Sequence, residues 1–166
     1  NRGPRMDRLD KKILRLLQED ATLAVADVAK RVGLSTTPCW RRIQKLEEEG
    51  VIKRRVAILD PAKVNARVTV FVSIRVASHS GEWLKRFSEV VREFPEVVEF
   101  YRMSGDVDYL LRVVVPDIAA YDAVYQRLIQ KIEIRDVSSS FAMEQIKYTT
   151  QMPLDYLVLD KERSAD

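Results

Sequence analysis

A single glycine divides two short amphipathic segments between Ala24 and Lys53, and this arrangement constrains the fold more than any other part of the chain. Four small or branched apolar residues recur at helical spacing before the glycine: Val25, Val28, Ala29 and Val32. Gly33 can adopt the left-handed conformation that ends a helix. Ser35 is a favoured N-cap for a second helix, and the first turn of that helix tolerates Pro38. The stretch therefore predicts a helix–turn–helix.

The apolar residues of the second helix decide which of its faces points outward. Cys39, Ile43 and Leu46 are spaced as i, i+4 and i+7, so we expect them to face the core. The opposite side and its flanks carry hydroxyl, indole, guanidinium, amide and ammonium groups, which bind base edges and phosphates. We predict DNA contacts from this helix and the basic patch after it: Ser35, Thr36, Thr37, Trp40, Arg41, Arg42, Gln44, Lys45, Arg54 and Arg55. The alternatives are a solvated helix face and a solvated hairpin.

Charge and cysteine content agree with a DNA-binding protein of a reducing compartment. Residues 1–60 carry 14 Lys and Arg against 9 Asp and Glu, a net charge of +5, whereas residues 61–166 carry 14 against 16, a net charge of −2. The lone cysteine, Cys39, excludes an internal disulfide. No apolar run approaches the ~20 residues that span a bilayer, and no segment resembles a secretory signal. We expect a cytoplasmic protein without a membrane partner. Met6 resembles a natural start, which leaves Asn1 to Arg5 as expected extra residues.

The periodicity changes along the chain, which predicts two domains. Asp7 to Asp20 has helical spacing, and the residues from Val51 to Pro61 read as a wing or linker strand. From Val68 the pattern alternates strands and helices. Strands are expected at 68–76, 97–104, 108–115 and 137–146, and helices at 81–94 and 117–132. The twice-repeated order strand–helix–strand predicts an α+β fold, an antiparallel four-stranded sheet with both helices on one face. We place a winged helix–turn–helix with its linker strand at 6–60 and the second domain at 61–160.

The predicted strands have apolar side chains at both parities. Examples are Val70, Phe71 and Val72 in the first strand, and Leu110 and Leu111 in the third. Only one face of the sheet is covered by the two helices, so the other face would be exposed and apolar. Such a face is normally covered by another subunit. We therefore expect this domain to dimerise through its sheet.

The residue types that enzymes and metal sites require are scarce in this chain. The single histidine, His79, lies in a polar loop and is expected to be a surface residue. Asp106 and Asp108 flank a turn and have no histidine, lysine or nucleophile nearby in sequence. No spacing suits a metal cage, and no glycine-rich phosphate loop occurs. We expect no enzymatic activity, no metal and no cofactor.

Several motifs of the chain resemble the leucine-responsive/asparagine-responsive (Lrp/AsnC) family of transcription regulators. The matching stretches read LDKKILRLLQED, VGLSTTPCWRRIQKLEEEGVIK, SGDVDYLLRVVVPD and SSSFAMEQIKYTT, in the family order and across about residues 7–155. The resemblance implies an N-terminal winged helix–turn–helix joined by a strand linker to a ferredoxin-like βαββαβ domain that binds a free amino acid. It also implies dimers that assemble further, often into octamers, with double-stranded DNA wrapped against them.

The resemblance further implies an effector site near the turn after the second strand. A glycine there allows close backbone approach, and a carboxylate pairs with an α-ammonium group; serines of the last strand could supply hydroxyls. The expected effector-binding residues are Met103, Ser104, Gly105, Asp106, Asp108, Ser138, Ser139 and Ser140, with Asp108 taking the amino group. Val107 stands where the family often has an aromatic residue, which bears on the effector side chain that fits. The alternatives are a plain turn and a polar strand face.

The sequence leaves three functions open. The first is a sequence-specific transcription regulator whose DNA binding or assembly is modulated by a free amino acid. The second is an architectural protein that wraps DNA with little specificity. The third is a small-molecule-binding α+β domain whose N-terminal helices mediate assembly without a DNA function.

Overall fold

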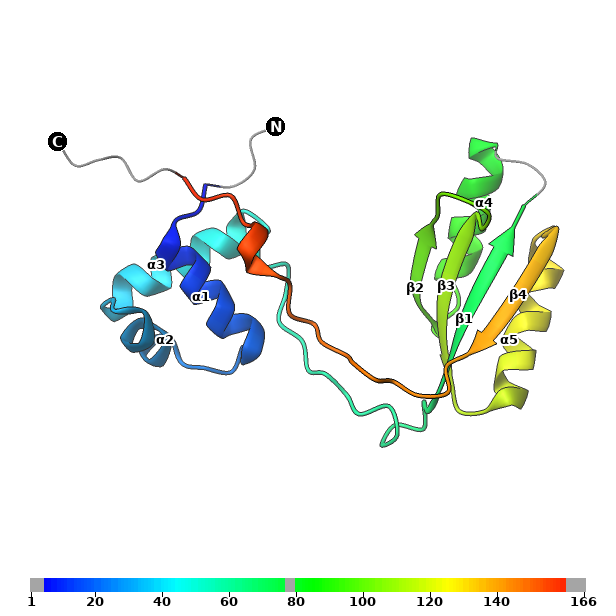
Figure 1. The fold of residues 1–166 in the computed structure, drawn as a ribbon, viewed down its shortest axis with the longest axis horizontal. Helices are drawn as coiled ribbons and strands as arrows, with labels where there is room; N and C mark the ends of the chain where they lie inside the picture. The colour runs from blue at the N-terminus through cyan, green and yellow to red at the C-terminus, as the bar shows by residue number, and fades with distance from the viewer. Residues whose placement is uncertain (1–4, 77–79, 161–166) are drawn as a thin grey trace. The chain divides into compact units, whose positions relative to one another are not determined.

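The computed structural model describes residues 5–76 and 80–160, so His79 lies outside the described residues. The chain forms two compact units (Figure 1). One contains the residues up to Ala57 together with those from Lys147 onward, and the other is Ile58–Ile146. The sequence periodicity did not indicate that the C-terminal residues pack with the N-terminal unit.

Three helices build the first unit, and the predicted helix–turn–helix is confirmed. The helices are α1 (Arg8–Glu19), α2 (Val25–Val32) and α3 (Thr36–Glu48). Asp7 caps α1 by accepting the backbone N–H groups of Leu9 and Asp10, and the Asp10 side chain accepts the Asp7 N–H in return. This reciprocal capping box satisfies backbone donors that a helix start leaves unpaired.

Gly33 makes the turn between α2 and α3 in the predicted conformation. Its φ of +78° lies in the left-handed region, where a side chain is disfavoured. The N–H of Leu34 donates to the carbonyl oxygen of Ala29 at 2.9 Å, which closes the end of α2. The three residues expected to face inward from α3 are at most 2% exposed: Cys39, Ile43 and Leu46. Ser35 occupies the N-cap position, but its side chain makes no capping hydrogen bond.

The segment after α3 is extended but does not form the predicted strand. Within the described chain, no backbone hydrogen bond involves residues 53–59. Val56, Ile58 and Leu59 are each more than half exposed there. These residues are strand-like in sequence and conformation, but they do not pair with another strand in the described part of the chain.

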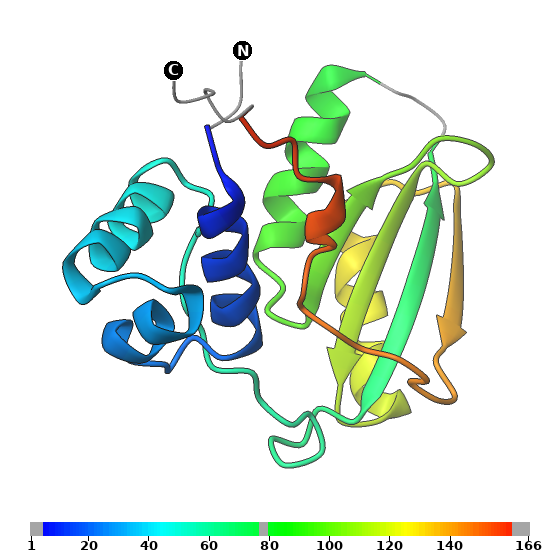
Figure 2. The same cartoon turned by 60° about the vertical axis from the view of Figure 1, so that its left-hand side comes forward.

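The second unit is the predicted antiparallel sheet with two helices. Its elements are β1 (Val68–Arg75), α4 (Gly81–Arg92), β2 (Val97–Arg102), β3 (Tyr109–Val115), α5 (Ile118–Lys131) and β4 (Asp136–Phe141). The strands lie in the order β2-β3-β1-β4, and every neighbouring pair is antiparallel. Strand β4 ends at Phe141, five residues earlier than the alternation predicted. Residues of both helices pack against the same face of the sheet, and Figure 2 shows α5 behind the strands.

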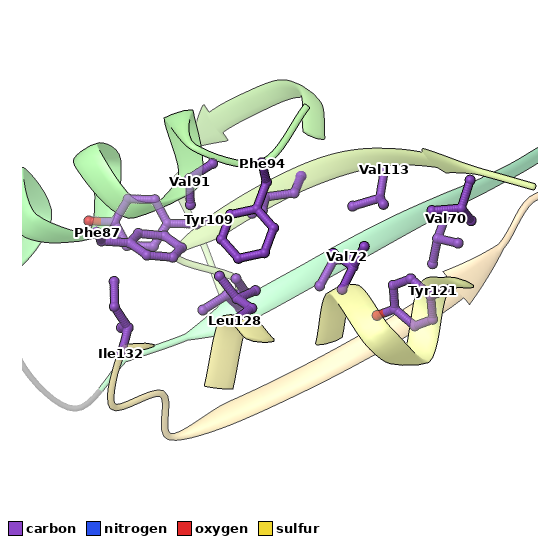
Figure 3. Close-up of a cluster of buried hydrophobic side chains, with 14 of the residues drawn as sticks. Val70, Val72, Phe87, Val91, Phe94, Tyr109, Val113, Tyr121, Leu128 and Ile132 are labelled. Atoms are coloured by element: carbon purple, nitrogen blue, oxygen red, sulfur yellow. The ribbon is translucent and has the colours of Figure 1, made fainter. Parts of the chain in front are cut away.

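The core of the second unit lies between the sheet and its helices. Alternate residues of β1 and β3 point into it, together with aromatic and branched residues of α4 and α5 (Figure 3). Phe87 is fully buried and its ring centroid lies 5.3 Å from that of Tyr109, nearly edge to face. Ile118 is 68% exposed, because it begins α5 and the stripe that faces the sheet runs through Tyr121, Val124 and Leu128.

Candidate nucleic-acid interface and ligand-binding turn

The outer face of α3 presents most of the polar residues predicted to contact DNA. Thr36, Thr37 and Arg41 are exposed, as is the N-cap Ser35, and Trp40 is half exposed. Gln44 is partly buried on the same side. The guanidinium of Arg41 makes no ion pair or hydrogen bond with any residue in the described ranges. Its full set of donors is thus available for a base or a phosphate.

Lys45 is also exposed and makes only a loose intrahelical ion pair. Its Nζ lies 3.8 Å from Oε1 of Glu49, one turn further along α3. An exposed i,i+4 pair of this kind contributes at most about 0.5 kcal/mol. A phosphate could therefore replace Glu49 as the partner of Lys45 at little cost.

Arg42 lies on the flank of α3 and binds two carboxylates of α1. Its Nη1 donates to Oδ2 of Asp7 and to Oδ1 of Asp10, both at 2.8 Å. Asp10 is 8% exposed, and it is a charged residue that the first unit buries. The same two carboxylates cap the start of α1. One guanidinium thus joins the middle of α3 to the capping box of α1.

The ionisation of this triad follows from its contacts. Burial tends to raise the pKa of Asp7, but the backbone N–H of Asp10 and the guanidinium of Arg42 outweigh burial, so the pKa lies below its ordinary value. Burial tends to lower the pKa of Arg42, and hydrogen bonds to Asp10 and Asp7 raise it above its ordinary value. Asp7 and Arg42 are therefore both charged at neutral pH and attract each other.

The basic residues after α3 also differ in whether they already bind a carboxylate. Arg55 donates from Nη2 to Oε1 of Glu47 at 2.9 Å, and its Nη1 lies 3.5 Å from the carbonyl oxygen of Ala21. Lys53 and Arg54 are exposed and have no ion pair within the described chain. Arg54 is therefore better placed than Arg55 to neutralise a phosphate.

Cys39 lies on the inner face of α3, as predicted. It is fully buried, and burial raises the pKa of its thiol above the ordinary value despite the nearby charge of Arg42. A protonated, buried thiol is a poor nucleophile. This environment fits a packing role.

The turn between β2 and β3 is held by its own backbone and by one carboxylate. Gly105 has a φ of +100°. The N–H of Met103 donates to the carbonyl oxygen of Asp108 at 2.8 Å, and the N–H of Asp108 donates to that of Ile74 at 3.0 Å. Oδ2 of Asp108 accepts the N–H of Val76 at 2.8 Å. Asp108 thus ties the turn to the end of β1.

Most of the remaining turn residues are exposed to solvent. Met103, Ser104, Gly105 and Asp106 are exposed, and Val107 is partly buried. Tyr109 and Val137 both pair with Ile74, so the turn and the start of β4 lie at the same end of the sheet. The structure therefore brings the turn near the beginning of the serine run.

The three serines of β4 do not share one face. The hydroxyl of Ser139 forms a hydrogen bond with that of Tyr121 in α5, on the helix-covered side. Ser138 and Ser140 are exposed on the other side, where they pair with Ser73 and Phe71 of β1. Since successive strand residues alternate between faces, one ligand at the turn cannot contact all three hydroxyls from the same side.

The described ranges hold no group of three His, Cys, Asp or Glu side chains that could bind a metal ion. Within the same ranges, no helix is both long enough and apolar enough to cross a membrane.

Comparisons with known proteins match both units. Residues 6–53 match a family model described as winged helix-turn-helix DNA-binding. Residues 69–152 match the Lrp/AsnC ligand binding domain. The DNA-binding transcriptional activator DecR of Escherichia coli K12 is 50% identical over 90% of this chain and 99% of its own length.

Solved structures show the same fold. The crystal structure of an AsnC family transcriptional regulator from Agrobacterium tumefaciens is 84% identical, with a TM-score of 0.90 over 92% of this chain and all of that one. A transcriptional regulator from Neisseria meningitidis, solved as an L-methionine complex, is 34% identical, with a TM-score of 0.87 over 92% and 99% of the two chains. Because both family models match and the relative DecR is 50% identical over 90% of this chain, the chain belongs to the Lrp/AsnC family of DNA-binding transcription regulators.

Proposed function

We propose that this regulator recognises specific double-stranded DNA through the outer face of α3, and that a free amino acid bound at the Met103–Asp108 turn modulates DNA binding or assembly. The observation that carries the proposal is the exposed guanidinium of Arg41 at the centre of that face, which forms no ion pair or hydrogen bond with residues 5–76 or 80–160. Arg binds guanine bidentately, and this contact is the commonest specific one in the major groove.

Neighbouring side chains supply the rest of the interface. Gln44 lies one turn from Trp40 on the same side of α3 and suits an adenine edge. Lys45 and Arg54 suit phosphates, which fix the register of the protein on the duplex without reading sequence. Arg42 and Arg55 hold carboxylates of their own unit, so they contribute mainly to the position of α3.

The turn has the features that an amino-acid effector needs. Gly105 leaves the backbone open to close approach, and Asp106 and Asp108 supply carboxylates for an α-ammonium group. Asp108 remains the predicted partner of that group, although its Oδ2 also accepts the Val76 N–H. Support comes from the Neisseria meningitidis relative, which was solved with L-methionine.

The regulator acts as a homo-oligomer in this proposal. On the sheet face away from the helices, Phe71 is 40% exposed, Tyr101 is 50% exposed and Leu110 is partly buried. Apolar faces of this kind are normally covered by another subunit. Residues 53–59 are extended and form no backbone hydrogen bond with the described part of the chain, so a second copy could pair with them. We therefore expect dimers that assemble further, up to octamers.

An electrophoretic shift on the DNA upstream of the protein's own gene tests the DNA-binding part. A specific reader should prefer its site over unrelated competitor DNA by at least ~10³-fold. Equal affinity for both DNAs would favour the architectural alternative. If no shift is seen at any salt concentration, the result would favour the alternative in which the N-terminal helices mediate assembly and do not bind DNA.

A thermal-shift screen against the twenty amino acids tests the effector part. A ligand at 100 times its Kd adds roughly 2.7 kcal/mol to the stability of the state that binds it. The expected result is a clear shift for one or a few amino acids. Absence of a shift at millimolar concentrations of all twenty would contradict amino-acid modulation without affecting the DNA-binding result.

A further inference from the structure

The C-terminal residues Gln151–Asp160 lie alongside α1, within the same compact unit (Figures 1 and 2). Gln18 recognises this segment with both ends of its carboxamide. Its Nε2 donates to the carbonyl oxygen of Met152 at 3.1 Å, and its Oε1 accepts the Met152 N–H at 2.9 Å. A single side chain that satisfies both backbone groups of one residue fixes the register of the segment.

Apolar packing follows directly after this contact. The segment makes one turn of 3-10 helix, η1 (Leu154–Tyr156). Leu154 and Leu157 are partly buried against the core of the three helices, whereas Tyr156 between them is 85% exposed. The turn therefore directs two leucines inward and leaves the intervening aromatic residue in solvent.

Further contacts hold the middle of the segment, at Asp155, and its end, at Asp160. Oδ1 of Asp155 lies 3.0 Å from Nζ of Lys11 and 3.7 Å from Nη2 of Arg15. The N–H of Asp160 donates to the carbonyl oxygen of Met6 at 2.9 Å, just before α1 begins. The ion pairs are exposed and individually weak, but together with the Gln18 contact they span the whole length of the helix.

The segment also forms one wall of an apolar pocket of about 530 Å³. Leu14 and Leu17 of α1 line the pocket, with Met152 and Leu154 of the segment facing them. Undocking the segment would expose the two α1 leucines to water. Loss of apolar burial is unfavourable in proportion to the area exposed, so the docked arrangement stabilises α1.

We propose that the C-terminal segment Gln151–Asp160, by docking on α1, stabilises the DNA-binding unit and thereby supports DNA binding. Asp7 and Asp10 of α1 hold α3 through Arg42. Because α1 positions α3 in this way, a contact that stabilises α1 also stabilises the position of the recognition helix. This role is independent of the effector and needs no bound ligand.

The test replaces the two inward leucines in the full chain. Hydrogen exchange of α1 and α4 is followed by mass spectrometry in Leu154→Ser/Leu157→Ser and in the matched control Tyr156→Ser. We expect exchange in α1 to become about fivefold faster or more in the double variant, and exchange in α4 to stay unchanged. DNA affinity should fall several-fold with an unchanged salt dependence, because no cation is removed. The control should match the parent in all three measurements.

Gln18→Ala provides a second, milder variant that removes the register contact without touching the leucines. It should accelerate exchange in α1 in the same direction. Unchanged protection of α1 in both variants would overturn the proposal, as would equal acceleration in α4, which would indicate a loss of stability not confined to the DNA-binding unit. The exchange measurement contains no DNA, so its failure is distinguishable from a failure of the proposed DNA-binding function.

Discussion

The recognition helix α3 and the turn Met103–Asp108 are both candidate binding sites, but they are built in opposite ways. In α3 the backbone forms the helical hydrogen bonds, and the outward guanidinium of Arg41 makes no hydrogen bond or ion pair with any residue that the structure describes. In the turn, the backbone and the carboxylate of Asp108 hold the loop against β1. A substitution on α3 can therefore remove function alone, whereas one in the turn affects fold and function together.

The same contrast occurs between two adjacent residues of α3. Arg41 is exposed and has no hydrogen-bond or ion-pair partner among the described residues, whereas Arg42 binds Asp7 and Asp10. Since the two side chains have identical chemistry, their variants separate the energetics of DNA reading from those of positioning.

Arg41→Ala is expected to have the largest effect on DNA binding. Loss of a bidentate base contact should cost roughly 1–3 kcal/mol on the specific site and much less on random DNA. Electrophoretic titration of both DNAs at one salt concentration measures this difference. An equal loss on both would make Arg41 a phosphate contact and would weaken the contrast with Arg42.

Asp108 offers the sharpest test of the turn, through two different substitutions. Asp108→Ala leaves the N–H of Val76 without its acceptor, which should lower the stability of the second unit by about 1–3 kcal/mol. It should also abolish the response to the amino acid found in the thermal-shift screen. Asp108→Asn keeps an acceptor oxygen for Val76 but loses the charge that attracts an α-ammonium group. It should lose the ligand response with little loss of stability.

Both readouts are needed for Asp108. Urea denaturation reports the stability, and the ligand-induced change in melting temperature reports the binding. Ligand-free DNA binding should stay near normal in Asp108→Asn. A full ligand response in this variant would place the effector site elsewhere, and the turn would then have only its structural role.

Arg42→Met should reduce stability more than it reduces specific recognition. Its removal leaves the largely buried carboxylate of Asp10 without a cation. Because Arg42 and Asp7 are about a third exposed or more, we expect a modest loss of about 1–2 kcal/mol. The slope of log affinity against log salt concentration should not change, whereas Lys45→Gln should reduce it by about one. A reduced slope at unchanged stability would make Arg42 a phosphate contact.

Acid provides a control for the Arg42 variant. The pKa of Asp7 lies below its ordinary value of 3.8, because the Asp10 N–H and Arg42 together outweigh burial, which raises it. The stabilisation from this carboxylate is present above pH 3.8 and is lost as the pH falls through its lower value in the folded state. The stability difference between the parent and Arg42→Met should therefore shrink below that pH. A constant difference would show that packing of the side-chain stem matters more than its charge.

Sequence reasoning found the elements because their local signals were strong. Gly33 at a helix end, Pro95 and Pro116 at element ends, and the regular spacing of Cys39, Ile43 and Leu46 are all local patterns. The pairing of Arg42 with α1 was not foreseen, because its partners lie more than 30 residues away in sequence. The D-x-x-D spacing of Asp7 and Asp10 is a capping signal that could have drawn attention to them.

Non-local contacts also explain the other differences. The docking of the C-terminal residues could not be predicted, since Met152 and Leu154 show no periodicity that indicates packing on a distant helix. The sequence of the serine run did not show which face of the sheet each serine occupies. Strand pairing was needed to show that Ser139 faces α5 while Ser138 and Ser140 face away.

Cys39 provides the smallest expected effect and completes the comparison of the two faces of α3. It is fully buried on the side opposite Arg41, and burial raises the pKa of its thiol. The native protein should therefore react slowly with iodoacetamide at pH 7.5 and retain DNA binding after mild treatment. Cys39→Ala should leave DNA affinity unchanged and lower the free energy of unfolding by about 1 kcal/mol, measured in urea. Rapid alkylation of the folded protein, with parallel loss of DNA binding, would instead show that the inner face of α3 opens readily and that Cys39 acts as an exposed redox switch.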